Sequence, residues 1–174
     1  AFAGLPDPAD VVDGLYVVSN DITANQTGVA VASERELGYV EVALNRVSNA
    51  EFGIGAEAAL DGDKLVNLVT EANVVTKTTV GVGIDGDVSA TVEESDLLDN
   101  DQGVAARGNA SVYIEGSNVT SNRVGLNARG SANLNAAEST LMDNDQGVAA
   151  RENAFVDIEG SNVTSNRAGL NASD

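Results

Sequence analysis

The segment GSNVTSNRVGLNA begins at Gly116, and GSNVTSNRAGLNA begins at Gly160, 44 residues further along the chain. A second duplicated segment, DNDQGVAAR, starts at Asp99 and again at Asp143. Superimposing both pairs yields one 22-residue unit in which serine, asparagine and glycine recur at fixed positions. The aligned positions are Ser95, Ser117, Ser139 and Ser161; Asn100, Asn122, Asn144 and Asn166; and Gly103, Gly125, Gly147 and Gly169. A fixed period of this size predicts stacked units that bury a core only against their neighbours.

Within one unit the apolar residues alternate with other residues, as in a strand that has one buried and one solvent-exposed face. In the copy that starts at Ala110, for example, Val112 and Ile114 are separated by a single residue. Turn-forming residues then divide this copy into three short strands, at Gly116, Asn122, Gly125 and Gly130. Three strands and three turns in 22 residues describe one coil of a parallel β-helix.

The same register extends upstream with fading similarity. The anchors of each coil are Val17, Ile22 and Gly28; Val42, Val47 and Gly53; Thr70, Val75 and Gly81; and Val92, Leu97 and Gly103. The steps between coils are 25, 28 and then 22 residues, so we expect small bulges at the turns near Ser33–Gly38 and Ala58–Asp63. This register predicts about seven coils from Leu15 to the last residues, and a rod ~30–35 Å long.

The pattern of alternating Val, Ile and Leu, followed by S-x-V-T-x-N and then x-G-V/L-x-A, resembles the right-handed parallel β-helix repeats of bacterial secreted proteins. That superfamily includes pectate-lyase-like enzymes, epimerases, phage tail spikes and surface proteins. The resemblance covers nearly the whole chain and implies an all-β, right-handed, single-stranded β-helix. It does not indicate one activity, because many functions share this scaffold.

Composition excludes several classes of function. The chain carries 27 acidic and 9 basic residues, a net charge of −18, with no histidine and no cysteine. We therefore expect no nucleic acid and no anionic membrane as partners, since both require basic patches. Cysteine or histidine metal sites, disulfides and histidine-based catalysis are excluded, and no stretch approaches the length of a membrane-spanning helix.

The N-terminal residues point to export. Residues 1–3 lie in the sequence AFAG, whose small–x–small pattern is that of a signal-peptide end. We expect residues 1–14 to form an extended arm, residues 15–174 to form the β-helix domain, and the protein to be extracellular, at the cell surface.

In a stack of coils, each aligned position becomes a row of neighbours ~4.8 Å apart. Asn100, Asn122, Asn144 and Asn166 form the clearest row, with Asn25 in the first coil, and we expect it to satisfy backbone groups at a turn. A ligand-binding row is the alternative.

Two further rows carry charge. The adjoining row alternates in sign through Asp101, Arg123, Asp145 and Arg167, which favours the 44-residue register because a slip of one coil places like charges together. Arg107, Arg129 and Arg151 form a like-charge row, for which we expect Glu93, Glu115 and Glu159 as partners, with acidic sugars as the alternative ligand.

We expect no catalytic and no cofactor-binding residues. Carboxylate pairs suffice for glycoside hydrolysis, but the chain has six aromatic residues and no long inserted loop after Asp63 to wall a groove. The carboxylates in question are therefore expected to be solvated turn residues: Asp96, Asp99, Asp101, Asp143 and Asp145.

Acidic turns and N-x-S/T triplets raise two further kinds of site, for metal and for glycan. Asp61, Asp63, Asp85 and Asp87 stand in two acidic Asp-Gly-Asp turns. Gly81–Asp87 (GVGIDGD) resembles the glycine-rich calcium motif, but that motif does not recur, so no dedicated metal site is expected. Asn118 and Asn162 both begin the triplet NVT and could be glycosylated. A repeat rich in Asn, Ser and Thr also generates such triplets by chance.

The two ends of the predicted β-helix suggest a function. The last coil, from Ala154, passes through all three strand positions, and its edge repeats an internal coil interface almost letter for letter. Such edges invite pairing, and a heterologous interface that does not close forms a filament. The leading hypothesis is a non-enzymatic, exported subunit that stacks head to tail. The alternatives are an adhesin or carbohydrate-binding module that contacts cell-surface polysaccharide and, less favoured, a polysaccharide lyase or hydrolase.

Overall fold

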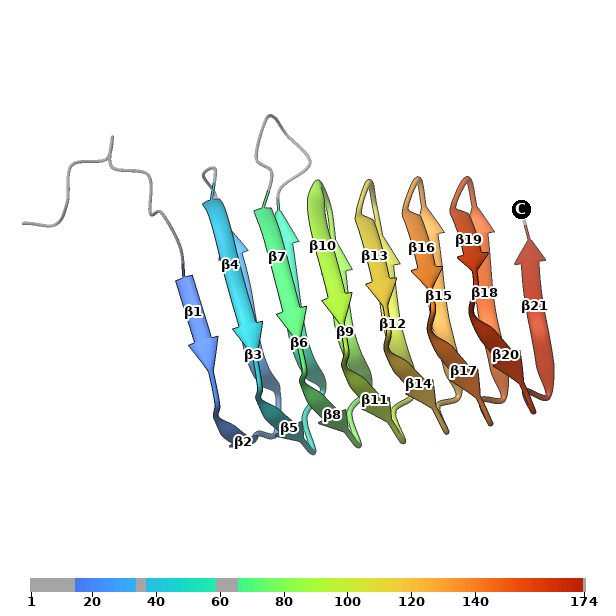
Figure 1. Ribbon diagram of the computed structural model, residues 1–174. Coiled ribbons are helices and arrows are strands. Elements are labelled where there is room, and N and C mark those ends of the chain that lie inside the picture. The colour runs from blue at the N-terminus through green and yellow to red at the C-terminus, as the bar shows by residue number, and fades with distance from the viewer. Residues whose placement is uncertain (1–14, 34–36, 59–65, 174) are drawn as a thin grey trace, which may run out of the picture.

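The protein is a rod of seven stacked coils, each made of three strands (Figure 1). The computed structural model describes residues 15–33, 37–58 and 66–173. All 21 elements of this part of the chain are β-strands, so no helix there is long and apolar enough to cross a membrane. The all-β solenoid expected from the repeat is confirmed.

Corresponding strands of successive coils pair in parallel and form three seven-stranded sheets. Sheet A contains β1 (Leu15–Val18), β4 (Leu37–Ala43), β7 (Val66–Glu71), β10 (Val88–Glu93), β13 (Ser111–Glu115), β16 (Asn133–Ala137) and β19 (Phe155–Glu159). Sheet B contains β2 (Asp21–Thr23), β5 (Arg46–Ser48), β8 (Val74–Thr76), β11 (Asp96–Leu98), β14 (Asn118–Thr120), β17 (Thr140–Met142) and β20 (Asn162–Thr164). Sheet C contains β3 (Thr27–Ser33), β6 (Phe52–Ala58), β9 (Val80–Asp85), β12 (Gln102–Arg107), β15 (Val124–Gly130), β18 (Gln146–Glu152) and β21 (Ala168–Ser173).

The register expected from the sequence is confirmed in every coil. Ile22 pairs with Val47, Val47 with Val75, and Val75 with Leu97, which are the steps of 25, 28 and 22 residues. The two expected bulges fall largely on residues 34–36 and 59–65, which lie outside the described part of the chain. The expected arm at residues 1–14 lies outside it as well. The pairing of β4 with β7 shifts register between Leu37 and Val40.

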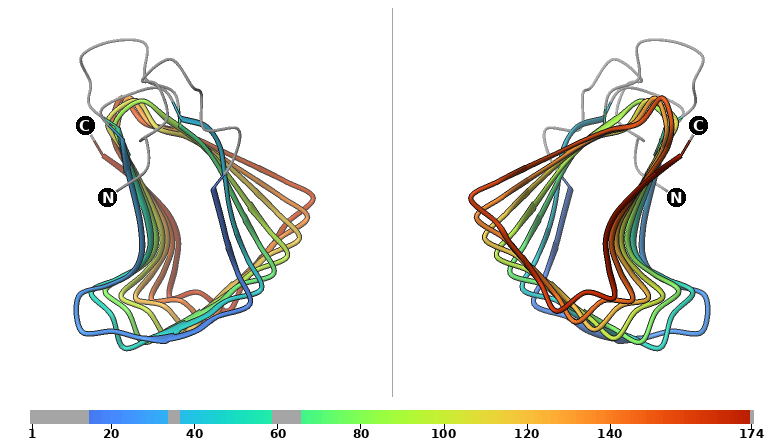
Figure 2. Two further views of the ribbon diagram at one scale, coloured as in Figure 1. Left: turned by 90° about the vertical axis from the view of Figure 1, so that its left-hand side faces the viewer. Right: turned by 90° about the vertical axis from the view of Figure 1, so that its right-hand side faces the viewer.

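The core is a set of apolar rows that run along the rod axis. One such row, through sheet B, contains Ile22, Val47, Val75, Leu97, Val119, Leu141 and Val163. Its central members, from Val47 to Leu141, are fully buried. Seen along the axis, successive coils superimpose with a gradual offset (Figure 2), so each side chain packs mainly on its equivalent one coil away.

Each corner between sheets A and B is a tight turn whose first residue has a positive φ. Glu94, Gly116, Glu138 and Gly160 occupy equivalent places in four successive coils, with φ of 45, 58, 48 and 59°. A side chain in this region costs about 1 kcal/mol relative to glycine. The glutamates show that this corner tolerates the cost.

A second set of glycines, which form a row along sheet C, is required for a steric reason. A Cβ on Gly125 would lie 2.6 Å from the carbonyl oxygen of Gly147 and 3.1 Å from Asn144 Nδ2. Gly28, Gly53, Gly81, Gly103 and Gly147 face the next coil in the same way. Glycine is required here because neighbouring backbones approach too closely for any side chain.

We expect Gly125→Ala to destabilise the fold by roughly 2–3 kcal/mol, since two backbones must separate. The matched control is Gly116→Ala, whose Cβ would meet nothing nearer than Glu94 Cγ at 3.8 Å. It should cost only about 1 kcal/mol, for its positive φ. Urea denaturation of both variants measures the difference, and equal losses would contradict a steric role for the glycine row.

One core residue weakens the fold. Thr70 is fully buried between Val42 and Val92, and its hydroxyl has no hydrogen-bond partner. Thr70→Val should therefore raise the free energy of unfolding by about 1 kcal/mol, since it removes an unpaired polar group without changing shape. Thr78→Val is the control, because the Thr78 hydroxyl donates to Asn100 Oδ1 at 2.8 Å, and it should be destabilising in the same urea titration.

Candidate functional site

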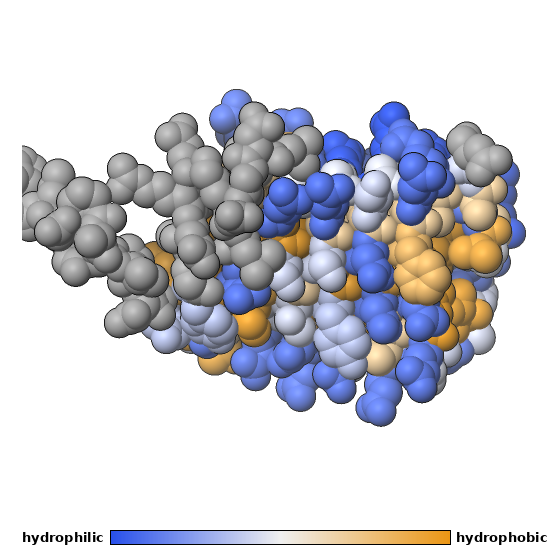
Figure 3. Space-filling model, turned by 90° about the horizontal axis from the view of Figure 1, so that it is seen from above, coloured by the Kyte–Doolittle hydropathy of each residue, from blue (hydrophilic) through white to orange (hydrophobic). Residues whose placement is uncertain are grey.

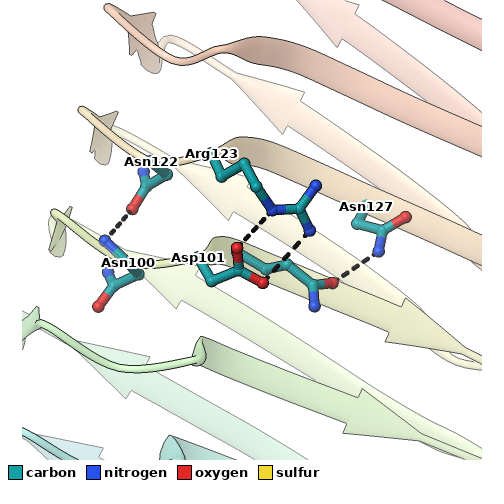
Figure 4. Close-up of polar contacts among 6 residues, drawn as sticks. Asn100, Asp101, Asn122, Arg123 and Asn127 are labelled. Atoms are coloured by element: carbon teal, nitrogen blue, oxygen red, sulfur yellow. Dashed lines mark hydrogen bonds and ion pairs between the residues drawn. The ribbon is translucent and has the colours of Figure 1, made fainter.

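The expected asparagine row lies at the corner between sheets B and C and satisfies turn backbone (Figure 4). The N–H of Asn100 donates to Asn122 Oδ1, and the N–H of Asn122 to Asn144 Oδ1, each at 2.9 Å. The Asn122 side-chain amide also donates to the Leu97 carbonyl at 3.0 Å. Asn100, Asn122 and Asn144 are 2–3% exposed, too deep for a ligand row. Ala50 and Thr78 separate Asn25 from this run.

The structure adds a second polar row, at the corner between sheets A and B, which the sequence interpretation missed. It contains Asn20, Asn45, Asn73, Ser95, Ser117, Ser139 and Ser161. The N–H of Asn45 donates to Asn73 Oδ1 at 2.9 Å, and the N–H of Ser117 to Ser139 Oγ at 3.2 Å. Its signal was present, because the three asparagines keep the 25- and 28-residue steps and then give way to serine.

The alternating charge row makes an ion pair at the same corner as the asparagines. Arg123 donates through Nε and Nη2 to both carboxylate oxygens of Asp101 (Figure 4). This hydrogen bond raises the pKa of Arg123. Beside it the Asn127 amide donates to Gln102 Oε1 at 2.6 Å. Both contacts join one coil to the next within the 44-residue unit.

The partners expected for the arginine row were wrong. Arg129 binds Glu152 with Nε 2.8 Å from Oε1. Glu93, Glu115 and Glu159 instead end strands of sheet A, at the corner with sheet B, whereas the arginines lie within one residue of the ends of strands of sheet C. The sequence could not distinguish these two outward-facing corners, because both follow the same alternation.

The expected turn carboxylates lie at turns and strand starts along the rod. Asp99 and Asp143 have positive φ in turns, each at 56°, and Asp96 accepts a hydrogen bond from Asn118 Nδ2 at 2.8 Å. Among the described residues no group of three or more potential ligands lies together to hold a metal ion. Asp61 and Asp63 lie outside that part of the chain, and Asp87 accepts from Asn109 Nδ2. Asn118 and Asn162 are both exposed.

The two end coils expose residues that belong to the apolar core rows. Leu170 continues the row of Leu126 and Val148 yet is 67% exposed, and Leu15, in the row of Val40, is 46% exposed. Apolar side chains gather at the end formed by the last coil (Figure 3). These two surfaces are the end faces: Leu15–Ser33 at the N-terminal side and Ala154–Ser173 at the C-terminal side.

The polar turn rows give the end faces opposite polarity. Within each row the N–H of one coil donates to the side-chain oxygen of the following coil. In this direction the last N–H donors of the two rows are those of Ser161 and Asn166, at the C-terminal face, whereas Asn20 lies at the acceptor end of its row at the N-terminal face, with Asn25 at the equivalent sequence position of the other row. One face donates where the other accepts.

A groove with a volume of 320 Å³ lies on the outer face of sheet C, across β3, β6, β9 and β12. Its floor is the outward row Ala30, Gly55, Gly83 and Ala105. The chain flares outward at the turn before this sheet, so the sheet is recessed beside it (Figure 2). Phe52 flanks the groove and is 37% exposed, and Glu57, Asp85 and Arg107 form the opposite rim.

Comparison with known proteins agrees with this architecture. The family described as "Right handed beta helix region" matches residues 27–174. No curated protein and no solved structure matches the chain. The match spans most of the chain, including six of its seven coils in full. The protein therefore belongs to the right-handed β-helix family.

Proposed function

We propose that this protein is an exported, non-enzymatic structural subunit that assembles head to tail into an extracellular filament. The complementarity of its two end faces carries the proposal. The resemblance to secreted β-helix proteins supports export.

The apolar rows continue from one end face to the other. With the internal register extended across the joint, Val17 of one copy follows Ile158 of the preceding copy, and Ile22 follows Val163. Val29 likewise follows Leu170. Every one of these pairs is apolar, so the joint would bury the residues that the end faces leave exposed.

The polar turn rows favour head-to-tail over head-to-head association of the copies. Across the same joint the N–H of Ser161 meets Asn20 Oδ1, and the N–H of Asn166 meets Asn25 Oδ1, which repeats the internal contact of 2.9–3.2 Å. Unpaired strand edges add a backbone ladder on all three sheets. The opposite arrangement, end face against like end face, would align donors with donors.

The charged residues described on the two end faces do not oppose the joint. The charged residues of the C-terminal face include Asp157, Glu159 and Arg167, and the extended register places them beside Tyr16, Val18 and Gln26. Asp21 falls beside Asn162, which repeats the kind of contact seen between Asp96 and Asn118. Among the described residues no two like charges meet.

Gly169→Ala is the sharpest test of this joint. In the free subunit nothing lies within 4 Å of a Cβ on Gly169, so the variant should fold normally. Across the joint that Cβ would meet the Gly28 carbonyl of the next copy at about the 2.8 Å by which Gly147 meets Gly169. We expect wild-type protein to form unbranched filaments with an axial repeat of ~30–35 Å, and Gly169→Ala to remain monomeric.

Electron microscopy and sedimentation measure both proteins. Asn171→Ala is the control, since this outward, exposed residue lies on the same strand and its loss creates no clash. Because Gly169→Ala keeps an intact N-terminal face, adding it to wild-type protein should terminate filaments and shorten them. Wild-type monomers at all concentrations, or filaments formed equally well by Gly169→Ala, would refute the joint.

The groove on sheet C favours a second candidate, a carbohydrate-binding module. A flat floor of small residues beside Phe52 suits the apolar face of a sugar ring, and Glu57 and Asp85 can accept hydrogen bonds from its hydroxyl groups. Gly55 is not required by packing, since its Cβ would meet nothing nearer than 3.8 Å. The net charge of −18 favours neutral over acidic sugars.

Gly55→Val fills the groove without disturbing the core. If the groove binds sugar, this variant should lose at least about tenfold in affinity for any neutral oligosaccharide that the wild-type protein binds on a glycan array. Ser111→Val, an equivalent addition on the outer face of sheet A, should bind like wild type. Absence of binding by wild-type protein, or equal binding by Gly55→Val, would remove this candidate.

A further inference from the structure

We infer that ionic strength controls the end-to-end assembly, so that the filament forms in salt and dissociates when salt is removed. This inference rests on the proposed filament. The buried polar residues of the described chain are all uncharged Asn, Ser, Thr and Gln. The charged residues of the described chain therefore all lie outside its core, and the full chain carries a net charge of −18.

Little of this charge is neutralised locally. Six glutamates lie at the corner between sheets A and B, distributed over five successive coils: Glu71, Glu93, Glu94, Glu115, Glu138 and Glu159. The two ion pairs among the described residues, at Arg123 and Arg129, lie at other corners. Burial and the charge of four of these glutamates raise the pKa of nearby Tyr113, in keeping with an unneutralised negative field along this edge.

Stacking concentrates the charge on one axis. A subunit of seven coils at ~4.8 Å per coil contributes ~34 Å to a filament. Its net charge of −18 then amounts to roughly one negative charge per 2 Å of axis, close to the ~1.7 Å of duplex DNA. A polyanion of this density is stable only with its counterions.

The repulsion acts between whole subunits and not through contacts at the joint, where no like charges of the described residues meet. Its range is set by the Debye length, about 30 Å at 0.01 M salt and about 3 Å at 1 M. At low salt this range equals the length of a subunit, so each copy is repelled by all the charge of its neighbour. At high salt it is shorter than one coil, and the apolar joint dominates.

The test is the critical concentration for assembly, measured by sedimentation of the full chain from 0.01 to 1 M NaCl. We expect it to fall by at least about tenfold over this range. The triple variant Glu93→Gln, Glu94→Gln, Glu115→Gln lies in interior coils away from the joint. It should assemble at several-fold lower concentration than wild type at low salt, and identically at 1 M.

The charge-conserving control is Glu93→Asp, Glu94→Asp, Glu115→Asp, which should follow the wild-type salt curve. This comparison separates screening of the glutamate charges from general salting-out, which would lower the critical concentration of wild type, the Gln variant and the Asp variant equally. If filaments form but their critical concentration does not depend on salt, or is the same for the Gln variant as for wild type, the proposed regulation by ionic strength is refuted and the proposed filament is not. Monomers at every salt concentration overturn both.

Discussion

Close parallel stacking of equivalent residues, ~4.8 Å apart along one axis, is the constraint on which the rest of the structure depends. It brings the backbone of each coil so near the next that Gly103, Gly125 and Gly147 admit no side chain. It also converts each aligned position into a chemical row. Apolar rows fill the interior, and Asn or Ser rows satisfy the backbone of two corners.

Stacking alone leaves one freedom, a slip by a whole coil, because successive coils are so alike. The contacts of Arg123 with Asp101 and of Asn127 with Gln102 remove much of it. Each joins unlike residues in neighbouring coils, so a slip of 22 residues would set Asp101 beside Asp145 and Gln102 beside Ala149. Exposed ion pairs are worth little individually, but here they act on register, which explains a repeat that is more faithful at 44 residues than at 22.

The interactions that hold the coils together are the same as those proposed to join the copies. An end face is an internal coil interface without its neighbour, and it presents the same apolar rows, strand edges and directional turn donors. The first coil has diverged from the later repeats, yet it keeps Asn20 and Asn25 at the positions that would accept hydrogen bonds from a preceding copy in the proposed filament. The groove on sheet C has a different origin from these rows, because the packing of the coils does not require a glycine at position 55 in its floor.

The sequence by itself determined the coil length, the three strands per coil, the pairing of Val47 with Val75 and the role of the asparagine row. These follow from period and alternation, which are local properties that a linear chain displays directly. Only the tertiary structure decided that Arg129 binds Glu152 and that sheet C carries a groove. Alternation shows which side chains point outward, but the path of the turns determines which outward side chains meet and where the surface is recessed.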